Sequence, residues 1–274
     1  MNDRRRVRAG RPQGFTLIEL IVVLIILGIL AALTSDIILK PFRAFQDQAR
    51  RAQLVAEADT AMTRMVRELR HALPNSVRVA GGGQYLEFIP TIDGGRYRAA
   101  QDPSTPAIED ILDFTQADVS FDVVGGLQSG ETSPGDFVVV YNTGAGSSDA
   151  YKGDNRASIS SVSPTSITLT AGKKFPHPSL EAQRFDIVPA TGPVTFYCQG
   201  GALRRHTGYG FAQAQPTGFT SQGALLAEHV TTCQFDYNPG DNVRSGVVTM
   251  RLRLTDAEGE SIALLYQAHV VNAP

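Results

Sequence analysis

The chain has 274 residues, a length that allows one large domain or two small ones. Hydrophobic residues make up 42 % of it and charged residues 19 %, so a packed core is possible. The formal net charge of −2 argues against a broad nucleic-acid-binding surface, and no nucleic-acid partner is expected. Five arginines lie within residues 1–14, so the basic charge is concentrated in a short leader.

An apolar run follows this leader. From Phe15 to Leu33 only Thr16 and Glu19 are polar. A helix rises about 1.5 Å per residue, so this run is long enough to cross the hydrocarbon core of a bilayer. The arginines that precede it predict a cytoplasmic N-terminus, with the rest of the chain on the other side of the membrane.

The carboxylate of Glu19 separates three interpretations of this segment. Two interpretations, a plain signal anchor and a secretory signal cleaved near the small residues 31–35, do not require Glu19. A lipid-facing helix tolerates such a charge poorly. Cleavage between Gly14 and Phe15 would instead create an α-amino group four residues from Glu19. That amine could pair with Glu19 of the same chain or of a neighbouring subunit, and would then fix the register between subunits.

The sequence "GFTLIE" (14–19) after an arginine-rich leader resembles the prepilin signature of type IV pilins and type II secretion pseudopilins. The resemblance implies that a prepilin peptidase cuts after Gly14 and N-methylates Phe15. It also implies that Glu19 guides docking into a helical filament, at an inner-membrane assembly platform and among other major and minor pilins. The expected location is a single pass through the lipid of the inner membrane, with a periplasmic C-terminal domain or a place at the pilus tip on the cell surface.

Residues 36–74 are expected to continue the helix as an amphipathic segment. Apolar side chains recur there every three or four positions, with charged residues between them. Pro41 should kink or break the helix, and Pro74 should stop it. The apolar positions are Phe42, Phe45, Ala49, Ala52, Ala56, Met62, Met65, Val66, Leu69 and Leu73.

Residues 75–274 are predicted to form an antiparallel β-rich domain, which gives an α+β fold with one long N-terminal helix. Segments rich in β-branched and aromatic residues, separated by Gly- and Pro-rich breaks, indicate the strands. The segment "VTMRLRLT" (248–255) alternates, so one of its faces should be buried. The seven expected strands are 84–90, 136–142, 166–171, 184–190, 194–199, 247–255 and 261–271.

The two cysteines, Cys198 and Cys233, lie 35 positions apart and form no CxxC motif. Outside the cytosol they are expected to form a disulfide, which would stabilise the fold by roughly 4 kcal/mol on the chain-entropy model. The alternative is two unrelated buried thiols.

No catalytic or metal site is predicted, and no cofactor. The chain has no GxSxG motif, and none of its five histidines lies beside a recognisable catalytic partner. The segment "DYNPGDN" (236–242) lacks the spacing and the final glutamate of a calcium loop. An enzyme is therefore not expected.

Beyond the N-terminus, the stretches 194–205, 225–237 and 246–274 are similar to the MshO family of MSHA pilus biogenesis proteins, whose implied role is a minor pilin that initiates or caps the filament. A J-type pseudopilin of a type II secretion system and a tip adhesin are the alternatives. Residues 91–190 carry no assignable motif.

Overall fold

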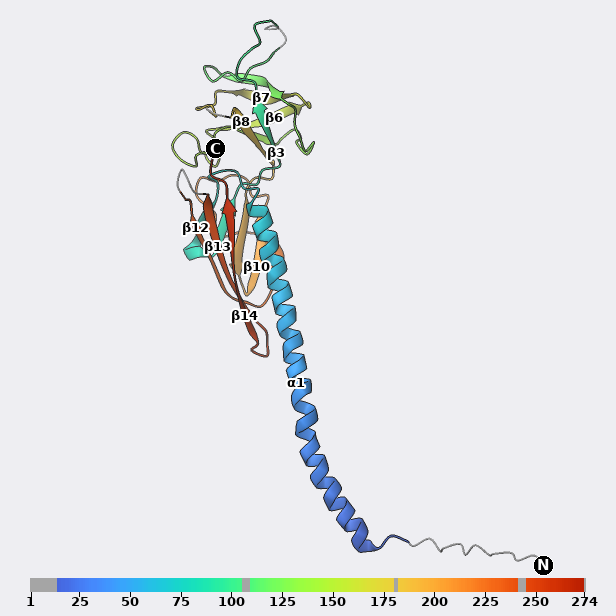
Figure 1. Ribbon diagram of the computed structural model, residues 1–274. Coiled ribbons are helices and arrows are strands. Elements are labelled where there is room, and N and C mark those ends of the chain that lie inside the picture. The colour runs from blue at the N-terminus through green and yellow to red at the C-terminus, as the bar shows by residue number, and fades with distance from the viewer. Residues whose placement is uncertain (1–13, 105–108, 180–181, 241–244, 274) are drawn as a thin grey trace, which may run out of the picture. The chain divides into compact units, whose positions relative to one another are not determined.

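The computed structural model describes residues 14–104, 109–179, 182–240 and 245–273 (Figure 1). The predicted leader, apart from Gly14, and the end of the 236–242 segment lie outside these residues. Helix α1 runs unbroken over Leu17–Leu69 and contains Pro41, so the predicted break at this proline is wrong. A proline removes a single hydrogen bond from the ladder, and the turns on both sides keep theirs. The helix ends at Leu69, before the predicted stop at Pro74.

The chain forms two compact units, one ending at Ala52 and the other covering Gln53–Pro274. The described part of the first unit consists of residues 14–16 and the first part of α1. The second unit contains the last turns of α1 and all the described strands. A single N-terminal helix followed by antiparallel sheets confirms the α+β fold class.

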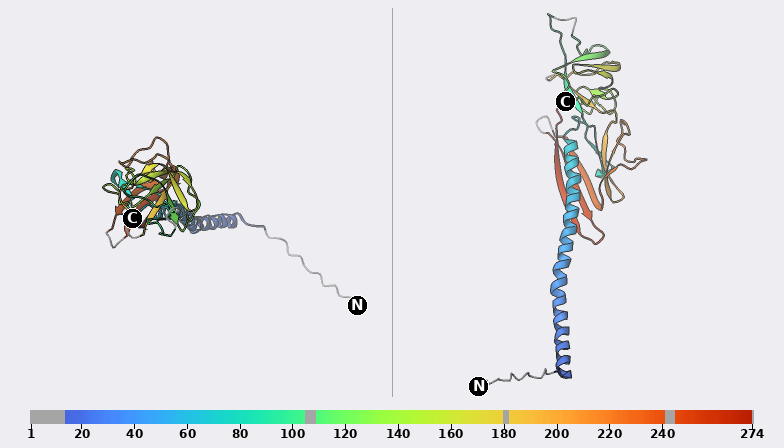
Figure 2. Two further views of the ribbon diagram at one scale, coloured as in Figure 1. Left: turned by 90° about the horizontal axis from the view of Figure 1, so that it is seen from above. Right: turned by 90° about the vertical axis from the view of Figure 1, so that its right-hand side faces the viewer.

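The last turns of α1 are accompanied by two antiparallel sheets (Figure 2). The five-stranded sheet has the order β1-β2-β9-β10-β11, and a short 3₁₀ turn, η1 (Gly81–Gly83), joins β1 to β2. The three-stranded sheet has the order β12-β13-β14. The strands of the first are β1 (Arg78–Ala80), β2 (Tyr85–Phe88), β9 (Val194–Gln199), β10 (Ala202–Thr207) and β11 (Ala224–Ala227). Those of the second are β12 (Val230–Asn238), β13 (Gly246–Thr255) and β14 (Ser261–Val270).

Residues 93–188 contribute a third element, a closed six-stranded barrel with the order β3-β4-β7-β6-β5-β8. Its core contains Phe121, Phe175 and Phe185, together with Tyr97 from β3 and aliphatic residues from the other five strands. The barrel is inserted between β2 and β9, which pair directly with each other: Phe88 lies opposite Val194. Its strands are β3 (Asp93–Tyr97), β4 (Asp118–Val124), β5 (Phe137–Val139), β6 (Arg156–Val162), β7 (Ser166–Lys173) and β8 (Arg184–Val188).

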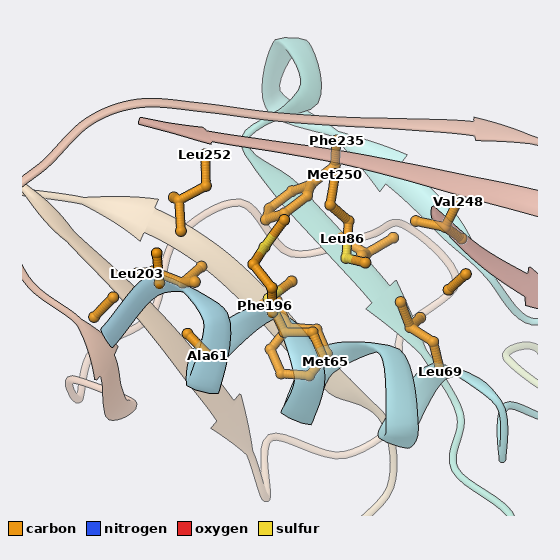
Figure 3. Packing of buried hydrophobic residues seen from close by; sticks show 14 of the residues in the cluster. Ala61, Met65, Leu69, Leu86, Phe196, Leu203, Phe235, Val248, Met250 and Leu252 are labelled. Atoms are coloured by element: carbon orange, nitrogen blue, oxygen red, sulfur yellow. The ribbon is translucent and has the colours of Figure 1, made fainter. Parts of the chain in front are cut away.

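The main core lies where α1 packs on both sheets (Figure 3). Strand β13 shows why: Val248, Met250, Leu252 and Leu254 are buried, whereas the arginines that alternate with them are exposed. The period of two along a strand places all four apolar side chains on one face. From α1 the buried side chains are Leu54, Ala58, Ala61, Met62, Met65 and Leu69, which recur every three or four positions.

Candidate processing and assembly site

The predicted cleavage point lies at the accessible end of the apolar helix. Gly14 and Phe15 precede the first helical residue, Leu17, and the Phe15 side chain is 84 % exposed. A Cβ added to Gly14 would meet no atom within 4 Å. The peptide bond between Gly14 and Phe15 is therefore not shielded by the fold of the described residues.

Thr16 and Glu19 cap this helix reciprocally. The backbone N–H of Glu19 donates to Thr16 Oγ1 at 3.3 Å, and the backbone N–H of Thr16 donates to Glu19 Oε2 at 3.4 Å. This is the S/T-x-x-E capping box, which satisfies two amide groups that the first turn leaves without partners. Glu19 thus has a local structural role in the uncleaved chain, in addition to the predicted pairing with the Phe15 amine. The pattern Thr16-x-x-Glu19 was visible in the sequence, and the sequence reasoning missed it.

The helix beyond this cap is apolar on all sides. Its segment Leu17–Thr34 is the one described helix long and apolar enough to cross a membrane, and none of it is buried within the chain. At about 1.5 Å per residue its length of 18 residues is roughly 27 Å, close to the thickness of the hydrocarbon core. A helix that is apolar on every side requires lipid or other helices around it.

Polar contacts hold the last turns of α1 on the β-sheets. The Arg205 Nε atom of β10 lies 2.8 Å from Glu68 Oε2. The Tyr266 hydroxyl of β14 donates to Asp59, so both sheets are tied to the helix. Strand β10 lies between β9 and β11, so Arg205 projects from an inner strand of the sheet toward the helix.

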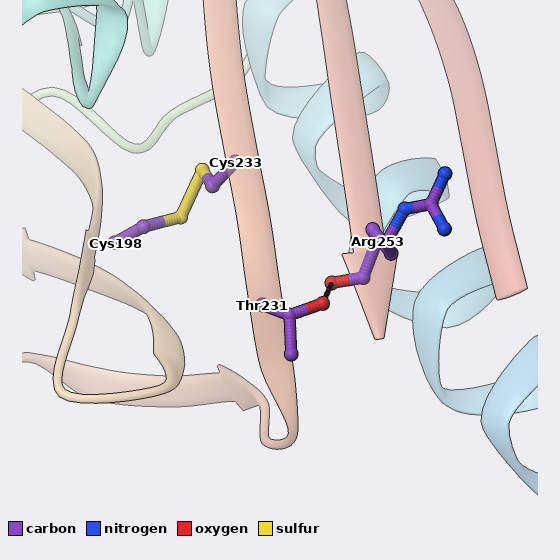
Figure 4. The surroundings of a disulfide bond; sticks show 4 residues. All are labelled: Cys198, Thr231, Cys233 and Arg253. Carbon is purple, nitrogen blue, oxygen red and sulfur yellow. Dashed lines mark hydrogen bonds between the residues drawn. A yellow bond between two sulfur atoms is a disulfide. The ribbon is translucent and has the colours of Figure 1, made fainter. Parts of the chain in front are cut away.

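The disulfide between Cys198 and Cys233 joins the two sheets (Figure 4). Cys198 lies on β9 and Cys233 on β12, with their Cα atoms 6.3 Å apart. Near it, Thr231 Oγ1 donates to the carbonyl oxygen of Arg253 at 3.3 Å, which supports the pairing of β12 with β13. The two sheets share no strand pairing, so the disulfide is a covalent link across their seam.

A buried ion pair that the sequence reasoning missed connects three parts of the second unit. Glu87 on β2 is fully buried and pairs with Arg78 on β1. The Tyr209 hydroxyl, from the loop after β10, donates to Glu87 Oε1 at 2.8 Å. The Arg78 guanidinium also lies 3.5 Å from the centre of the Tyr151 ring, in the β5–β6 connection of the barrel. Burial raises the pKa of Glu87, and the Arg78 charge opposes this shift.

Two kinds of reactive arrangement, a metal-binding cluster and a Ser–His pair, are relevant to catalysis among the residues that the structure describes. No group of three or more His, Cys, Asp or Glu side chains is placed to hold a metal within them. His177 Nε2 lies 3.1 Å from Ser147 Oγ, but both residues are exposed and no described carboxylate hydrogen-bonds to His177. A catalytic serine needs a base that a third group orients in a sheltered site.

Comparison with known proteins adds one match. Residues 10–35 match the model of the prokaryotic N-terminal methylation motif, and neither curated proteins nor solved structures gave a match. The motif, the single apolar helix and the disulfide fit a protein anchored in the inner membrane that assembles with other pilins. The chain carries the prepilin-type methylation motif at residues 10–35 and has a long helix followed by a β-rich domain, and in these respects it resembles type IV pilins and pseudopilins.

Proposed function

We propose that the protein is a minor pilin of an MSHA-like type IV pilus, which enters the filament through α1 and helps to initiate or cap it. The observation that carries the proposal is the coincidence of the methylation motif with an exposed Gly14–Phe15 bond and an apolar helix that nothing in the chain covers. After cleavage the new Phe15 amine becomes the partner of Glu19. The prepilin peptidase and an inner-membrane platform act on the chain first, and it has no enzymatic activity of its own.

The domain supports a minor role. The inserted six-stranded barrel enlarges the domain beyond the two sheets against which α1 packs. A subunit of this bulk is harder to repeat along a thin filament than to place once at its end. The J-type pseudopilin of a type II secretion system remains the alternative, since it would share the same N-terminus. A tip adhesin is favoured by a different observation, the cleft described in the next subsection.

The test separates the charge of Glu19 from its capping role. Glutamine at this position keeps the capping box but has no charge, whereas valine loses both. We expect Glu19→Gln and Glu19→Val chains to be cleaved normally yet to be absent from sheared filaments, as measured by immunoblotting of the filament fraction. Thr16→Ala loses the cap but keeps the charge, and should still assemble.

Two results would contradict this account. Incorporation of the Glu19→Gln chain at the wild-type level would show that capping, and not charge pairing, is the function of Glu19. Normal processing of a Gly14→Leu chain would remove the cleavage assignment. Filaments that persist in a deletion strain, together with a loss of protein secretion, would favour the pseudopilin alternative.

A further inference from the structure

The outer surface of the barrel carries an unusual arrangement of charge on the β3–β8 ladder. Arg96 lies directly opposite Arg184, and Gly94 lies opposite Asp186. Residues two apart share a face of a strand, so both arginines and Asp186 point the same way. Phe185, between the two charged residues of β8, points into the barrel core. Three charged side chains therefore project from one small area.

Like charges directly opposite each other destabilise a pair of strands. Among the described residues neither arginine forms an ion pair with a carboxylate. Arg96 uses its Nε atom to donate to the carbonyl oxygen of Ala182 at 3.0 Å, and Arg184 makes no described hydrogen bond. The register thus places two arginine side chains directly across the ladder from each other with donors that no described group uses, and an anion bound by both would offset their repulsion.

These side chains line a cleft of about 570 Å³ between the barrel and the neighbouring part of the second unit. Its other walls come from the turn after α1 and from the segment after β14. This volume is within the usual range for small-molecule sites, roughly 300–1,000 Å³. The remaining lining residues include Pro74, Tyr141, Val271 and Ala273, so an apolar and aromatic wall faces the charged one.

Gly94 keeps the floor of the cleft open. A Cβ on Gly94 would lie 3.0 Å from the carbonyl oxygen of Phe185 and 3.6 Å from Asp186 Oδ1. A Cβ on Gly95 would instead point into the barrel core, 2.9 Å from the Phe185 ring. A side chain at Gly94 would therefore cover the carboxylate of Asp186. That carboxylate is half-buried and accepts no described hydrogen bond. Burial raises its pKa to about 6, against the opposing effect of the Arg184 charge.

We propose that this cleft binds a small ligand through a carboxylate group, which Arg96 and Arg184 hold, while a hydroxyl or amide group of the ligand donates to Asp186. Arginine forks bind carboxylates with two parallel hydrogen bonds, which gives orientation as well as affinity. The aromatic and apolar wall formed by Tyr141 and Val271 packs on the body of the ligand. An acidic sugar and the C-terminus of a peptide both carry this chemistry. The site goes beyond the proposed assembly role and is independent of it.

The experiment uses the purified full-length chain in detergent micelles, so it does not depend on filament formation. Binding is measured by saturation-transfer difference NMR and titration with two matched pairs of probes. Galacturonate is compared with galactose, and acetyl-dialanine with its C-terminal amide; within each pair only the carboxylate is lost. We expect the carboxylate member of at least one pair to bind and its neutral partner to bind at least about tenfold more weakly. The pair that responds identifies the source of the carboxylate.

Four variants make the assignment specific. Arg96→Gln and Arg184→Gln should each weaken carboxylate binding by about tenfold, whereas Arg253→Gln, an exposed arginine on β13, should leave it unchanged. Asp186→Asn removes a negative charge beside the bound anion, so it should keep or tighten carboxylate binding at pH 7.5. If these residues only maintained the shape of the cleft, Asp186→Asn would weaken binding as Arg96→Gln and Arg184→Gln do.

The proposal is overturned if no probe binds at about 10 mM, a concentration that corresponds to less than 3 kcal/mol of binding free energy. It is equally overturned if neutral and acidic probes bind alike, or if Arg253→Gln weakens binding as much as the cleft variants do. An Arg96→Gln/Arg184→Gln double variant that keeps wild-type affinity would also refute it. Loss of filament assembly in cells, with binding intact, would count against the proposed function and not against this site.

Discussion

The buried pair Arg78–Glu87 allows a quantitative test of what stabilises the second unit. Both residues lie on the five-stranded sheet, and Arg78 also contacts Tyr151 in the barrel. Replacing Arg78 with methionine keeps an unbranched side chain over the length of the arginine stem and removes the charged guanidinium group. Glu87, which is fully buried, would then keep only the hydrogen bond from Tyr209. Breaking a buried pair by removing one partner costs about 3–5 kcal/mol, because an uncompensated charge stays in the interior.

The loss of Arg78 also removes its two hydrogen bonds to the carbonyl oxygens of Ala212 and Gln213, and its contact with the Tyr151 ring. Water can replace partners at the carbonyl oxygens, because Gln213 is exposed and Ala212 is half-buried, so the buried carboxylate dominates the cost. We expect Arg78→Met to lower the free energy of unfolding by about 3 kcal/mol or more at pH 7.5. The measurement is denaturant unfolding of the full chain in detergent, followed by near-ultraviolet circular dichroism.

The pH dependence gives the sign of the effect. The folded-state pKa of Glu87 already lies above its unfolded value, and the loss of Arg78 would raise it further. A carboxyl with a raised folded pKa stabilises the fold below its unfolded pKa and loses that contribution as the pH rises through the folded pKa. The deficit of Arg78→Met should therefore shrink between pH 7.5 and pH 5. Adding Glu87→Gln, which removes the charge, should recover at least half of it.

If Arg78→Met lowers the free energy of unfolding by less than about 1 kcal/mol, the value typical of an exposed pair, the buried charge of Glu87 does not need Arg78. If Glu87→Gln does not rescue the variant, the unpaired charge is not the cause of the loss. A deficit that does not change with pH would show that the lost contacts of Arg78, and not the ionisation of Glu87, set the stability.

Two further predictions concern the covalent and modular parts of the second unit. Replacing both Cys198 and Cys233 with alanine should lower the free energy of unfolding by about 4 kcal/mol, since the disulfide closes a loop over a sequence separation of 35; unfolding unchanged by this double substitution would contradict that role. Replacing residues 90–192 with an Asn-Gly turn should leave the two sheets folded and the disulfide formed, because Phe88 and Val194 already pair. The measurement is the free-thiol content and protease resistance of the shortened chain. Free thiols would show that the sheets need the barrel in order to fold.

The sequence predicts the parts of the fold whose pattern is local. Alternation in "VTMRLRLT" correctly assigned the buried face of β13, and all seven expected strand segments contain strands. On α1 the spacing identified Met62, Met65 and Leu69 but also Ala56, which is exposed. The small residues Ala58 and Ala61 are buried instead, because α1 lies across two sheets whose shape decides how closely each turn approaches.

The barrel was predicted only in part: β5, β7 and β8 lie in expected segments, whereas β3, β4 and β6 do not. Strand β3 reads "DGGRY", which has neither alternation nor β-branched residues. Its glycines are explained by packing: a Cβ at Gly95 would collide with the ring of Phe185 on the paired strand. Closure of the barrel supplies β3 with two partners, β4 and β8, far away in the sequence. Such long-range pairing overrides a weak strand propensity.

The composition of the segment 142–155 is equally misleading. Its glycines and polar residues are typical of an exposed loop, yet Asn142, Asp149 and Asn155 are buried. Asn142 Nδ2 donates to the carbonyl oxygen of Pro74 at 2.6 Å, and the Tyr151 hydroxyl donates to the carbonyl oxygen of Ser76 at 2.9 Å. The polar side chains satisfy backbone groups of the turn after α1, so a hydrophilic sequence forms a buried contact.

These contacts join two parts of the second unit that have separate cores. The core under α1 is built from the helix and the two sheets, whereas the barrel has a core of its own. A small third cluster, with Leu73, Ile89 and Tyr151, and the Arg78–Glu87 pair join them. Substitutions on the outer face of β3 and β8 touch neither the helix core nor the Cys198–Cys233 link. The proposed ligand cleft and the packing of α1 can therefore be altered by separate substitutions, which lets the two proposals be tested independently.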